Sequence, residues 1–582
     1  MSTPAVTPTH GRRAPLRWAI ALVATVALIV SGSGLVVFAQ SGAGESQGPV
    51  FVPADAAIYL EARLDMPAGQ DEALAQMLTA FPGFADTGSF DLKVDELLSG
   101  LAAEMGLERT EADLVGDVLT GEMGLAIGDL GVAMMGADDP AMLVGLAVAD
   151  PALAAMLLES MAGDVGEEMY GGTTILSDLS TSAAIHDGWM LLSNDVAQVK
   201  TAIDVLDGTV DSLADDPGFS TSFARVPSGH LGAAYVDLQS FGSLIDLAGM
   251  MATGETGLDL PVDDLSAMLP QDMVMFLAAE ADRLNLEVLV TAGESTPSLP
   301  LGESELAGLF PADTQLYLEA REVGASVKAA LDALVGTLAA QEGGGVLGDD
   351  SMGDMGGLGD LSDIEALFGE ESPITDLLGG VPLPEYLDFV ADASVGAGLS
   401  SDGLWLGMAG EVTDQAVATD RVSTITSLVD LFGGDPAQTG ISVESEMVGD
   451  VEVTSIMLPL DEMLAESGLP ISVGDSISVA VSDGYLLLGL GDFVQSALAG
   501  DAAGSLGASA GYLDAVGEDT ANTGLMYMNV SALLAALDPM LSMMLPEWAD
   551  IAPYATGVDR IILVGTADDA VMRARMTMIV NQ

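Results

Sequence analysis

Apolar and polar residues alternate in two nearly identical phrases of the chain, PADAAIYLEAR at Pro53–Arg63 and PADTQLYLEAR at Pro311–Arg321. In each phrase a Pro-Ala-Asp turn precedes three apolar residues that alternate with Tyr, Glu and Arg. This period of two is typical of a strand with one buried face. We therefore predict that the same strand opens two separate parts of the chain.

Further patterns recur in the same order. DGWMLLSNDVAQV at 187–199 is matched by DGYLLLGLGDFVQ at 483–495, in each case a turn, an apolar strand and a helix start. GAAYVDLQSF at 232–241 is matched by GLMYMNVSAL at 524–533, a strand that runs into a helix. The spacing between matching segments grows from 258 to about 295 positions. The order predicts a duplicated domain with insertions in the second copy, the clearest being the Gly- and Asp-rich loop 341–363.

Helical spacing occurs between these strands. DPALAAMLLESMAG and DVAQVKTAIDVLDG each have an Asp near the start and a Gly just past the end, as expected of capped helices. Strand-rich halves with helices after turns predict the α+β class, with two tandem related domains built on largely antiparallel sheets and packed helices. We place the first domain at 51–295, a linker at 296–308 and the second domain at 309–582.

The N-terminal segment carries a membrane signal. Three arginines, Arg12, Arg13 and Arg17, precede 22 uncharged residues at 18–39, a run that spans about 33 Å as a helix. The positive-inside rule places 1–17 in the cytoplasm and the C-terminal body outside, with 40–50 as a flexible tether. We predict a single-pass transmembrane signal anchor in the cell membrane, preceding the two domains. A cleaved signal peptide ending at Ala39 is the alternative, whereas Pro15 disfavours a twin-arginine signal.

Composition narrows the possible partners. The 582 residues include 88 acidic and 15 basic residues, a formal net charge of −73, which disfavours nucleic acids and anionic membranes as partners of the folded part. Hydrophobic residues make up 49% and the mean hydropathy is +0.44, so the body can bury enough apolar surface to fold. Cysteine does not occur, which excludes disulfides and thiolate chemistry.

Several strings resemble catalytic motifs without the context that these motifs need. Gly507-Ala-Ser509-Ala-Gly511 fits a nucleophile elbow, and Gly474-Asp-Ser-Ile477 resembles a Gly-Asp-Ser motif. Both require a histidine downstream, but the three histidines, His10, His186 and His230, all lie upstream. The Gly343, Gly345 and Gly348 spacing of a dinucleotide loop falls in an acidic loop, where it would repel phosphate.

The sequence gives little indication of a metal-binding site. The acidic loop carries oxygen donors at Asp349, Asp350, Asp354, Asp360 and Asp363, but their spacing fits no calcium motif and favours a solvated loop. With only two histidines in the body and no cysteine, a His-rich transition-metal site is not expected. Core or surface roles are the simpler prediction for His186 and His230.

One polar constellation occurs twice, namely the Tyr, Glu and Arg of the repeated strand. A carboxylate with a raised pKa could act in catalysis, but Glu and Arg two positions apart on one strand face more simply stabilise neighbouring strands. Methionine is abundant at 31 residues, with clusters at 540–548 and 247–254. Such clusters could line a cavity for an apolar molecule, although core filling is the simpler prediction.

The N-terminal apolar segment, followed by P-A-D-x-x-x-Y-L-E and a long body of Gly- and Ala-rich strands, resembles a family of bacterial exported proteins classed as a domain of unknown function. The resemblance covers about residues 50–580 and implies no activity, cofactor or catalytic residue.

We therefore predict a non-catalytic protein that binds or scaffolds at the bacterial cell envelope. Its partners would be the membrane, through the N-terminal helix, and an envelope protein or apolar ligand, but no nucleic acid. A carrier or chaperone for a lipid or another apolar molecule is the first alternative, and a hydrolase-type enzyme using the Tyr/Glu/Arg face is the second. No catalytic, cofactor-binding or metal-binding residue is assigned. A carrier needs an apolar pocket, whereas an enzyme needs Glu61 or Glu319 in a cleft.

Overall fold

The computed structural model describes residues 48–63, 67, 69–84, 119–128, 141–162, 165–178, 181–241, 269–293, 300–303, 305–328, 375, 377–382, 385–400, 403–433, 439–460, 472–500, 504–517, 519–568 and 570–581. The expected anchor 18–39, the tether up to residue 47, His10 and the loop 341–363 lie outside these ranges. Within them no helix is long and apolar enough to cross a bilayer. The described residues fall into two compact units, the first up to residue 293 and the second from residue 300 on.

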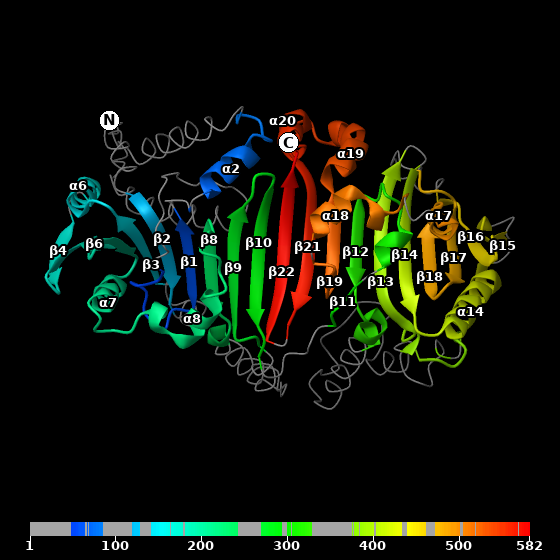
Figure 1. Cartoon of the computed structure of the whole chain (residues 1–582), viewed down its shortest axis with the longest axis horizontal. Coiled ribbons are helices and arrows are strands. Elements are labelled where there is room, and N and C mark those ends of the chain that lie inside the picture. Colours follow the sequence, from blue (N-terminus) through cyan, green and yellow to red (C-terminus); the bar gives the residue numbers. More distant parts are fainter. Residues whose placement is uncertain are drawn as a thin grey trace, which may run out of the picture. The chain divides into compact units, whose positions relative to one another are not determined.

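The first unit is built on an antiparallel sheet with the strand order β4-β5-β6-β7-β3-β2-β1-β8-β9-β10 (Figure 1). Its elements are β1 (Ile58–Arg63), α2 (Gln70–Leu78), β2 (Leu119–Ile127), β3 (Met142–Val148), α6 (Pro151–Ala162), β4 (Gly166–Tyr170), β5 (Thr173–Ser177), β6 (Ser182–His186), β7 (Trp189–Ser193), α7 (Val196–Leu206), η1 (Leu213–Asp215), α8 (Pro217–Phe223), β8 (Gly232–Asp237), η2 (Gln239–Phe241), β9 (Asp272–Ala279) and β10 (Arg283–Thr291).

The second unit has a main antiparallel sheet with the strand order β15-β16-β17-β18-β14-β13-β12-β20-β21-β22. Its elements are β11 (Gly302–Glu303), η3 (Leu306–Leu309), β12 (Leu316–Ala320), β13 (Val390–Ser400), β14 (Gly403–Val412), α14 (Gln415–Gly433), β15 (Ser442–Val448), β16 (Val451–Met457), β17 (Ser476–Ser482), β18 (Tyr485–Leu490), α17 (Phe493–Ala499), η6 (Leu506–Ala508), α18 (Ala510–Val516), β19 (Ala521–Asn522), β20 (Gly524–Asn529), α19 (Val530–Met544), α20 (Trp548–Ala555), β21 (Val558–Ala567) and β22 (Val571–Val580). The short strands β11 and β19 pair with each other.

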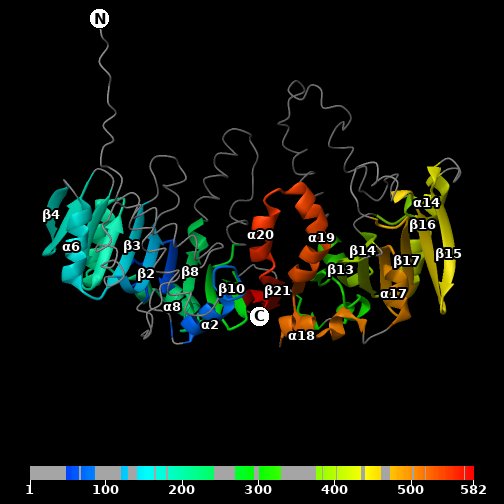
Figure 2. The ribbon, with the colours of Figure 1, turned by 90° about the horizontal axis from the view of Figure 1, so that it is seen from above.

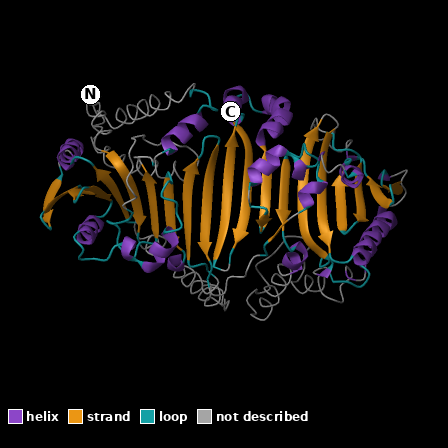
Figure 3. Cartoon of the chain, viewed as in Figure 1, coloured by secondary structure: helices purple, strands orange, loops and turns teal. Residues whose placement is uncertain are grey.

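Both units share one order of elements and pairings. The repeated strands β1 and β12 lie inside their sheets, each between two antiparallel neighbours. Tyr59 pairs in register with Tyr235, as Tyr317 does with Tyr527. Isolated bridges join Pro53 to Ser212 and Pro311 to Ser505, and the turn residues Asp187 and Asp483 both have positive φ. The expected α+β class with largely antiparallel sheets is confirmed (Figure 3).

Each sheet has two faces that differ in chemistry. We call the side that carries the repeated Tyr, Glu and Arg the tyrosine face, and the side that carries Leu60 or Leu318 the leucine face. In the second unit the tyrosine face packs into an aromatic core in which Phe310, Tyr317 and Phe493 are at most 1% exposed. Helix α6 covers the leucine face of the first unit through Ala154 and Leu158. The core of the second unit therefore lies mainly on its tyrosine face.

Glycines let aromatic rings lie flat on the strands of the tyrosine face. A Cβ added at Gly396 on β13 would lie 2.5 Å from the Phe310 ring, and one at Gly407 on β14 would lie 2.4 Å from the Phe493 ring. In the first unit a Cβ added at Gly145 would lie 2.4 Å from the Phe51 ring. Alanine does not fit at such contacts, so the rings and the glycines fix the packing distance together.

Candidate functional site

The repeated Tyr, Glu and Arg side chains are buried in both units. Glu61 is 4% exposed and Glu319 is 5% exposed, although carboxylates are seldom found fully buried unless paired. Each Glu accepts a hydrogen bond from the Tyr two residues before it, at 2.8 Å from the Tyr59 hydroxyl and 2.5 Å from the Tyr317 hydroxyl. Burial and, secondarily, the neighbouring Glu raise the pKa of Tyr59 and of Tyr317 well above the ordinary value. Both hydroxyls therefore remain protonated donors.

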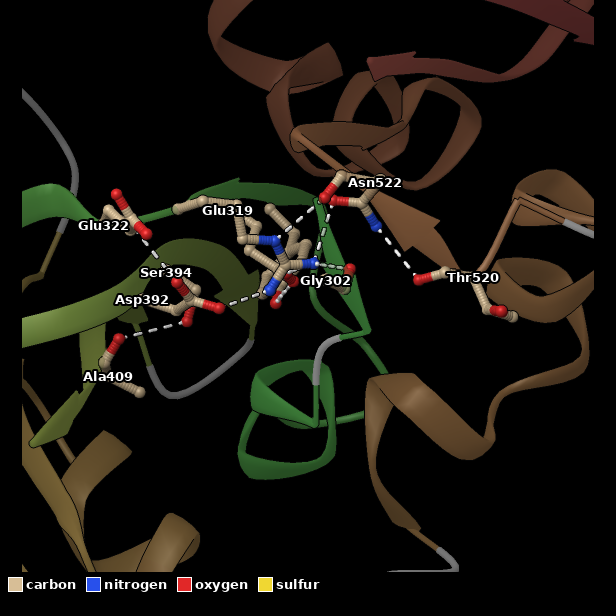
Figure 4. Close-up of polar contacts among 10 residues, drawn as sticks. Gly302, Glu319, Glu322, Asp392, Ser394, Ala409, Thr520 and Asn522 are labelled. Atoms are coloured by element: carbon tan, nitrogen blue, oxygen red, sulfur yellow. Dashed lines mark hydrogen bonds and ion pairs between the residues drawn. The ribbon is translucent and has the colours of Figure 1, made fainter. Parts of the chain in front are cut away.

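In the second unit Arg321 neutralises the buried carboxylate. Its Nη2 lies 2.7 Å from Glu319 Oε1, and its Nη1 donates to Asp392 Oδ2 at 2.7 Å. The guanidinium also donates to three oxygens at 2.9–3.1 Å, from the Gly302 backbone and from the backbone and side chain of Asn522. Glu319, Asp392 and Asn522 converge on this point from β12, β13 and β19 (Figure 4). The network thus joins the main sheet to the β11–β19 pair.

In the first unit a histidine also contacts the buried carboxylate. His230 Nε2 lies 2.5 Å from Glu61 Oε1, and His230 Nδ1 lies 2.7 Å from the Pro227 carbonyl oxygen. Because a carbonyl only accepts, Nδ1 carries a hydrogen. His230 and Asn522 each stand two residues before the strand that flanks the repeated strand, β8 or β20. Different side chains therefore occupy this equivalent position in the two networks.

An acid on the neighbouring strand completes each network. Arg63 pairs in register with Glu122 on β2, and Arg321 reaches Asp392 on β13. Glu122 is 5% exposed and its Oε1 accepts a hydrogen bond from the Gly48 backbone. The side chains of Glu61 and Glu319 have no exposed surface. Paired buried charges of this kind hold neighbouring strands together. Because both Glu side chains are fully buried, a substrate cannot reach either carboxylate from the described surface.

The other residues singled out in the sequence are separate from these networks. His186 contacts Thr173 at 2.7 Å and the exposed Asp207 at 3.1 Å near the surface. Ser509 accepts a hydrogen bond from the Tyr512 backbone and caps α18, and Ser476 begins β17. The candidate dinucleotide glycines and calcium ligands lie outside the described residues. Among the described residues no cluster of His, Asp and Glu could hold a metal ion.

The leucine face of the second unit carries a row of apolar side chains that runs across seven strands. Strand register places seven residues side by side, and we call them the leucine row: Met576, Leu563, Met526, Leu318, Val395, Met408 and Leu488. Five of them are 37–46% exposed. A second row beside it is also uncharged: Met578, Ile561, Met528, Leu316, Ala397, Leu406 and Leu490. An apolar surface this continuous is unusual on a soluble domain and marks an interaction site.

Three positions of the matching row in the first unit are covered. There the counterparts of Val395, Met408 and Leu488 are Leu125, Val144 and Leu192, which are at most 4% exposed. They belong to the cluster that packs against α6. In the second unit Met408 packs with the cluster of α14, and α19 contacts β13 and β21, but five residues of the leucine row remain exposed. At the three compared positions the apolar face is therefore more open in the second unit.

A hollow of about 1020 Å³ lies beside α14, and both faces of the sheet line it, Val479 and Val481 on the leucine face and Ala480 and Leu487 on the tyrosine face. Val422 and Thr426 of α14 line it together with Val443, Val479 and Val481 of the strands. Val479 is the register partner of Leu488, so the leucine row leads into the hollow. Its size is at the upper end of the range of small-molecule sites. The exposed carboxylates of Asp450, Glu452 and Asp483 also line the hollow, and its lining includes no basic residue.

Helices α19 and α20 form an apolar hairpin on the side of the second unit's sheet away from α18 (Figure 2). Trp548 donates to Asp538 at 2.8 Å and closes the hairpin. Met543 and Met544 are 68% and 62% exposed. Core filling, which the sequence favoured for this methionine cluster, is therefore wrong for these two residues, because both side chains are exposed on α19, which has no buried residue. The cluster at 247–254 lies outside the described residues.

The comparisons with known proteins identify a family. Residues 18–331, more than half of the chain, match the family described as Protein of unknown function (DUF3352), and the chain belongs to this family. This confirms the expected membership of a family of unknown function. No curated protein matches the sequence.

Solved structures of TP0453 are similar only at low scores. Crystal form I has a TM-score of 0.24 and 12% identity over 44% of this chain and 82% of TP0453. Crystal form IV has a TM-score of 0.22 and 13% identity over 43% and 81%. Scores this low carry no argument about fold or function.

Proposed function

We propose that the chain is a non-catalytic binding protein of the bacterial cell envelope that takes an apolar ligand on the leucine face of its second unit. The uncharged, exposed leucine row in a chain of net charge −73 carries this proposal. The arginines before the apolar run 18–39 support a membrane-anchored body outside the cytoplasm. The buried and satisfied Glu61 and Glu319 favour binding over hydrolysis.

We also infer that the two units arose by duplication, so that the open face is a difference between two copies of one framework. The shared strand order, the paired bridges at Pro53 and Pro311, and the Glu-centred networks support this. In the first unit the equivalent positions Leu125, Val144 and Leu192 are buried. The two copies therefore differ in how much of this face they expose.

The experiment is photo-crosslinking of the full chain in bacterial cells. A benzoylphenylalanine placed at Leu318 should form adducts on irradiation, detected by mass spectrometry of the purified protein. The control carries the same group at Met156, which is 65% exposed on α6 of the first unit, and should form few adducts. Equal yields at both positions, or none at Leu318, would overturn the proposal.

A further inference from the structure

The shape of the leucine face points to a long, thin occupant. The leucine row crosses seven strands, which at ~4.8 Å per strand gives a length of about 29 Å. One leaflet of a bilayer has a hydrocarbon depth of about 15 Å, half of the ~30 Å core. A complete acyl chain therefore fits along the row. Three methionines in the row, Met408, Met526 and Met576, supply flexible side chains that adapt to such a chain.

The charge around the face restricts what the rest of the occupant can carry. A second copy of this chain would bring another net charge of −73 against the same surface. A lipid with a net negative headgroup would meet Asp450, Glu452 and Asp483 in the hollow, where no basic residue lines the wall. A headgroup of zero net charge avoids this repulsion, and the ammonium group of a zwitterionic headgroup is attracted to these carboxylates.

No described basic residue of the second unit lines the hollow. Arg321 is 5% exposed and contacts Glu319 and Asp392. Arg560 and Arg575 contact Asp559 and Asp519. Arg421 on α14 lies over the Tyr386 ring, 5.1 Å from its centroid. Polar groups of α14 such as Thr419 and Ser423 line the hollow and offer uncharged hydrogen-bonding partners. The described residues thus combine the apolar leucine row with a hollow that carries carboxylate and hydroxyl groups.

We propose that the leucine face binds a lipid of zero net charge, with one acyl chain along the leucine row and the headgroup in the hollow beside α14. This inference rests on the proposed function and names the ligand class of the same site. The leucine face would shield the acyl chain from water. The carboxylates of the hollow would select against anionic lipids.

The test uses the full chain, purified in detergent and mixed with vesicles of phosphatidylcholine alone or of phosphatidylcholine with one third phosphatidylglycerol. With benzoylphenylalanine at Leu563, irradiation should yield adducts with the mass of phosphatidylcholine from both kinds of vesicle. Phosphatidylglycerol adducts should be at least about tenfold fewer than its share of the vesicles predicts. Leu488→Glu should lower the total yield by about tenfold, because a carboxylate then stands on the acyl-chain track.

A matched variant separates the headgroup preference from binding itself. Asp450→Asn/Glu452→Gln removes two exposed carboxylates of the hollow, and should raise the ratio of phosphatidylglycerol to phosphatidylcholine adducts towards the composition of the vesicles. Preferential phosphatidylglycerol adducts in the unaltered protein would overturn the lipid class while leaving the proposed function standing. Crosslinked species with twice the mass of the protein would show that a second copy of the protein occupies the face. This result would also overturn the proposed lipid class. Loss of every adduct, in cells as well as with vesicles, would instead reject the proposed function.

Discussion

At the residue scale, the repeated Tyr, Glu and Arg side chains form a buried charge network in each unit. The Tyr hydroxyl bonded to the Glu carboxylate is common to both units. The Glu carboxylate also contacts Arg321 in the second unit and His230 in the first. Burying a carboxylate is unfavourable without such a partner. Removing the partner should therefore destabilise the unit more than removing a surface charge.

Arg321→Met should lower the free energy of unfolding of the second unit by about 3 kcal/mol, because it leaves Glu319 and Asp392 without their shared cation. Urea unfolding followed by tryptophan fluorescence measures this change, since Trp405 lies in the core of that unit. The control, Lys328→Met, removes the cation of an exposed pair with Glu385 and should cost less than about 1 kcal/mol. Equal costs for the two variants would mean that the network does not stabilise the fold.

The partners in these networks explain what the sequence could and could not predict about the site. The alternation around Tyr59 and Tyr317 predicts a strand with polar groups on one face, and a structural role was the simpler interpretation. His230, however, is 169 positions from Glu61, and Asp392 is 71 positions from Arg321. Contacts this distant depend on strand order, which local periodicity does not specify. A shared strand offset in the two halves was the signal that could have paired His230 with Asn522.

At the scale of elements, glycines in the strands allow aromatic rings from other segments to pack closely on the sheet. Gly396 on β13 allows the Phe310 ring to approach its Cα, and Phe310 in turn packs on Tyr317 with ring centroids 5.1 Å apart. The period-two pattern predicted the repeated strand that contains Tyr317. It did not predict the ring packed on that strand, because Phe310 precedes the repeated phrase that starts at Pro311. The packing of η3 on the sheet is therefore a tertiary feature.

Gly396→Ala should destabilise the second unit by about 2 kcal/mol, because the added methyl group would collide with the Phe310 ring. Thermal unfolding followed by circular dichroism gives the change in midpoint. Gly308→Ala in η3 is the matched control, since nothing lies within 4 Å of its added Cβ, and it should change stability by less than about 0.5 kcal/mol. A neutral Gly396→Ala would show that the ring moves aside at little cost.

At the scale of the whole molecule, two units with the same strand order differ in which surface they leave open. The α+β class and the recurrence of elements followed from patterns repeated along 582 residues. The exposure of Leu318 did not, because Leu60 has the same sequence surroundings and is only partly exposed beside the cluster that includes α6. Alternation identifies which residues share a face, but only the packed helices decide whether water reaches it.

The proposed anchor can be tested with one substitution because the chain contains no cysteine. Ser41→Cys in the full chain should react with a membrane-impermeant maleimide in intact spheroplasts, as expected for a tether outside the cytoplasm. Ser2→Cys is the control and should react only after lysis. Labelling of Ser41→Cys only after lysis would contradict the proposed orientation. A mature protein that lacks residue 2 would instead support the cleaved signal peptide.

The insertion of β1 and β12 at equivalent places has a consequence for how the chain reaches its folded state. Each strand is the inner partner of two others, and the two share the residues YLEAR. Either strand can pair with the neighbours meant for its counterpart, so a chain that refolds all at once faces an exchange of strands between its halves. Release in order from the N-terminus avoids this competition, because the first unit closes around β1 before β12 emerges. Refolding from denaturant should consequently give lower yields than synthesis in the cell.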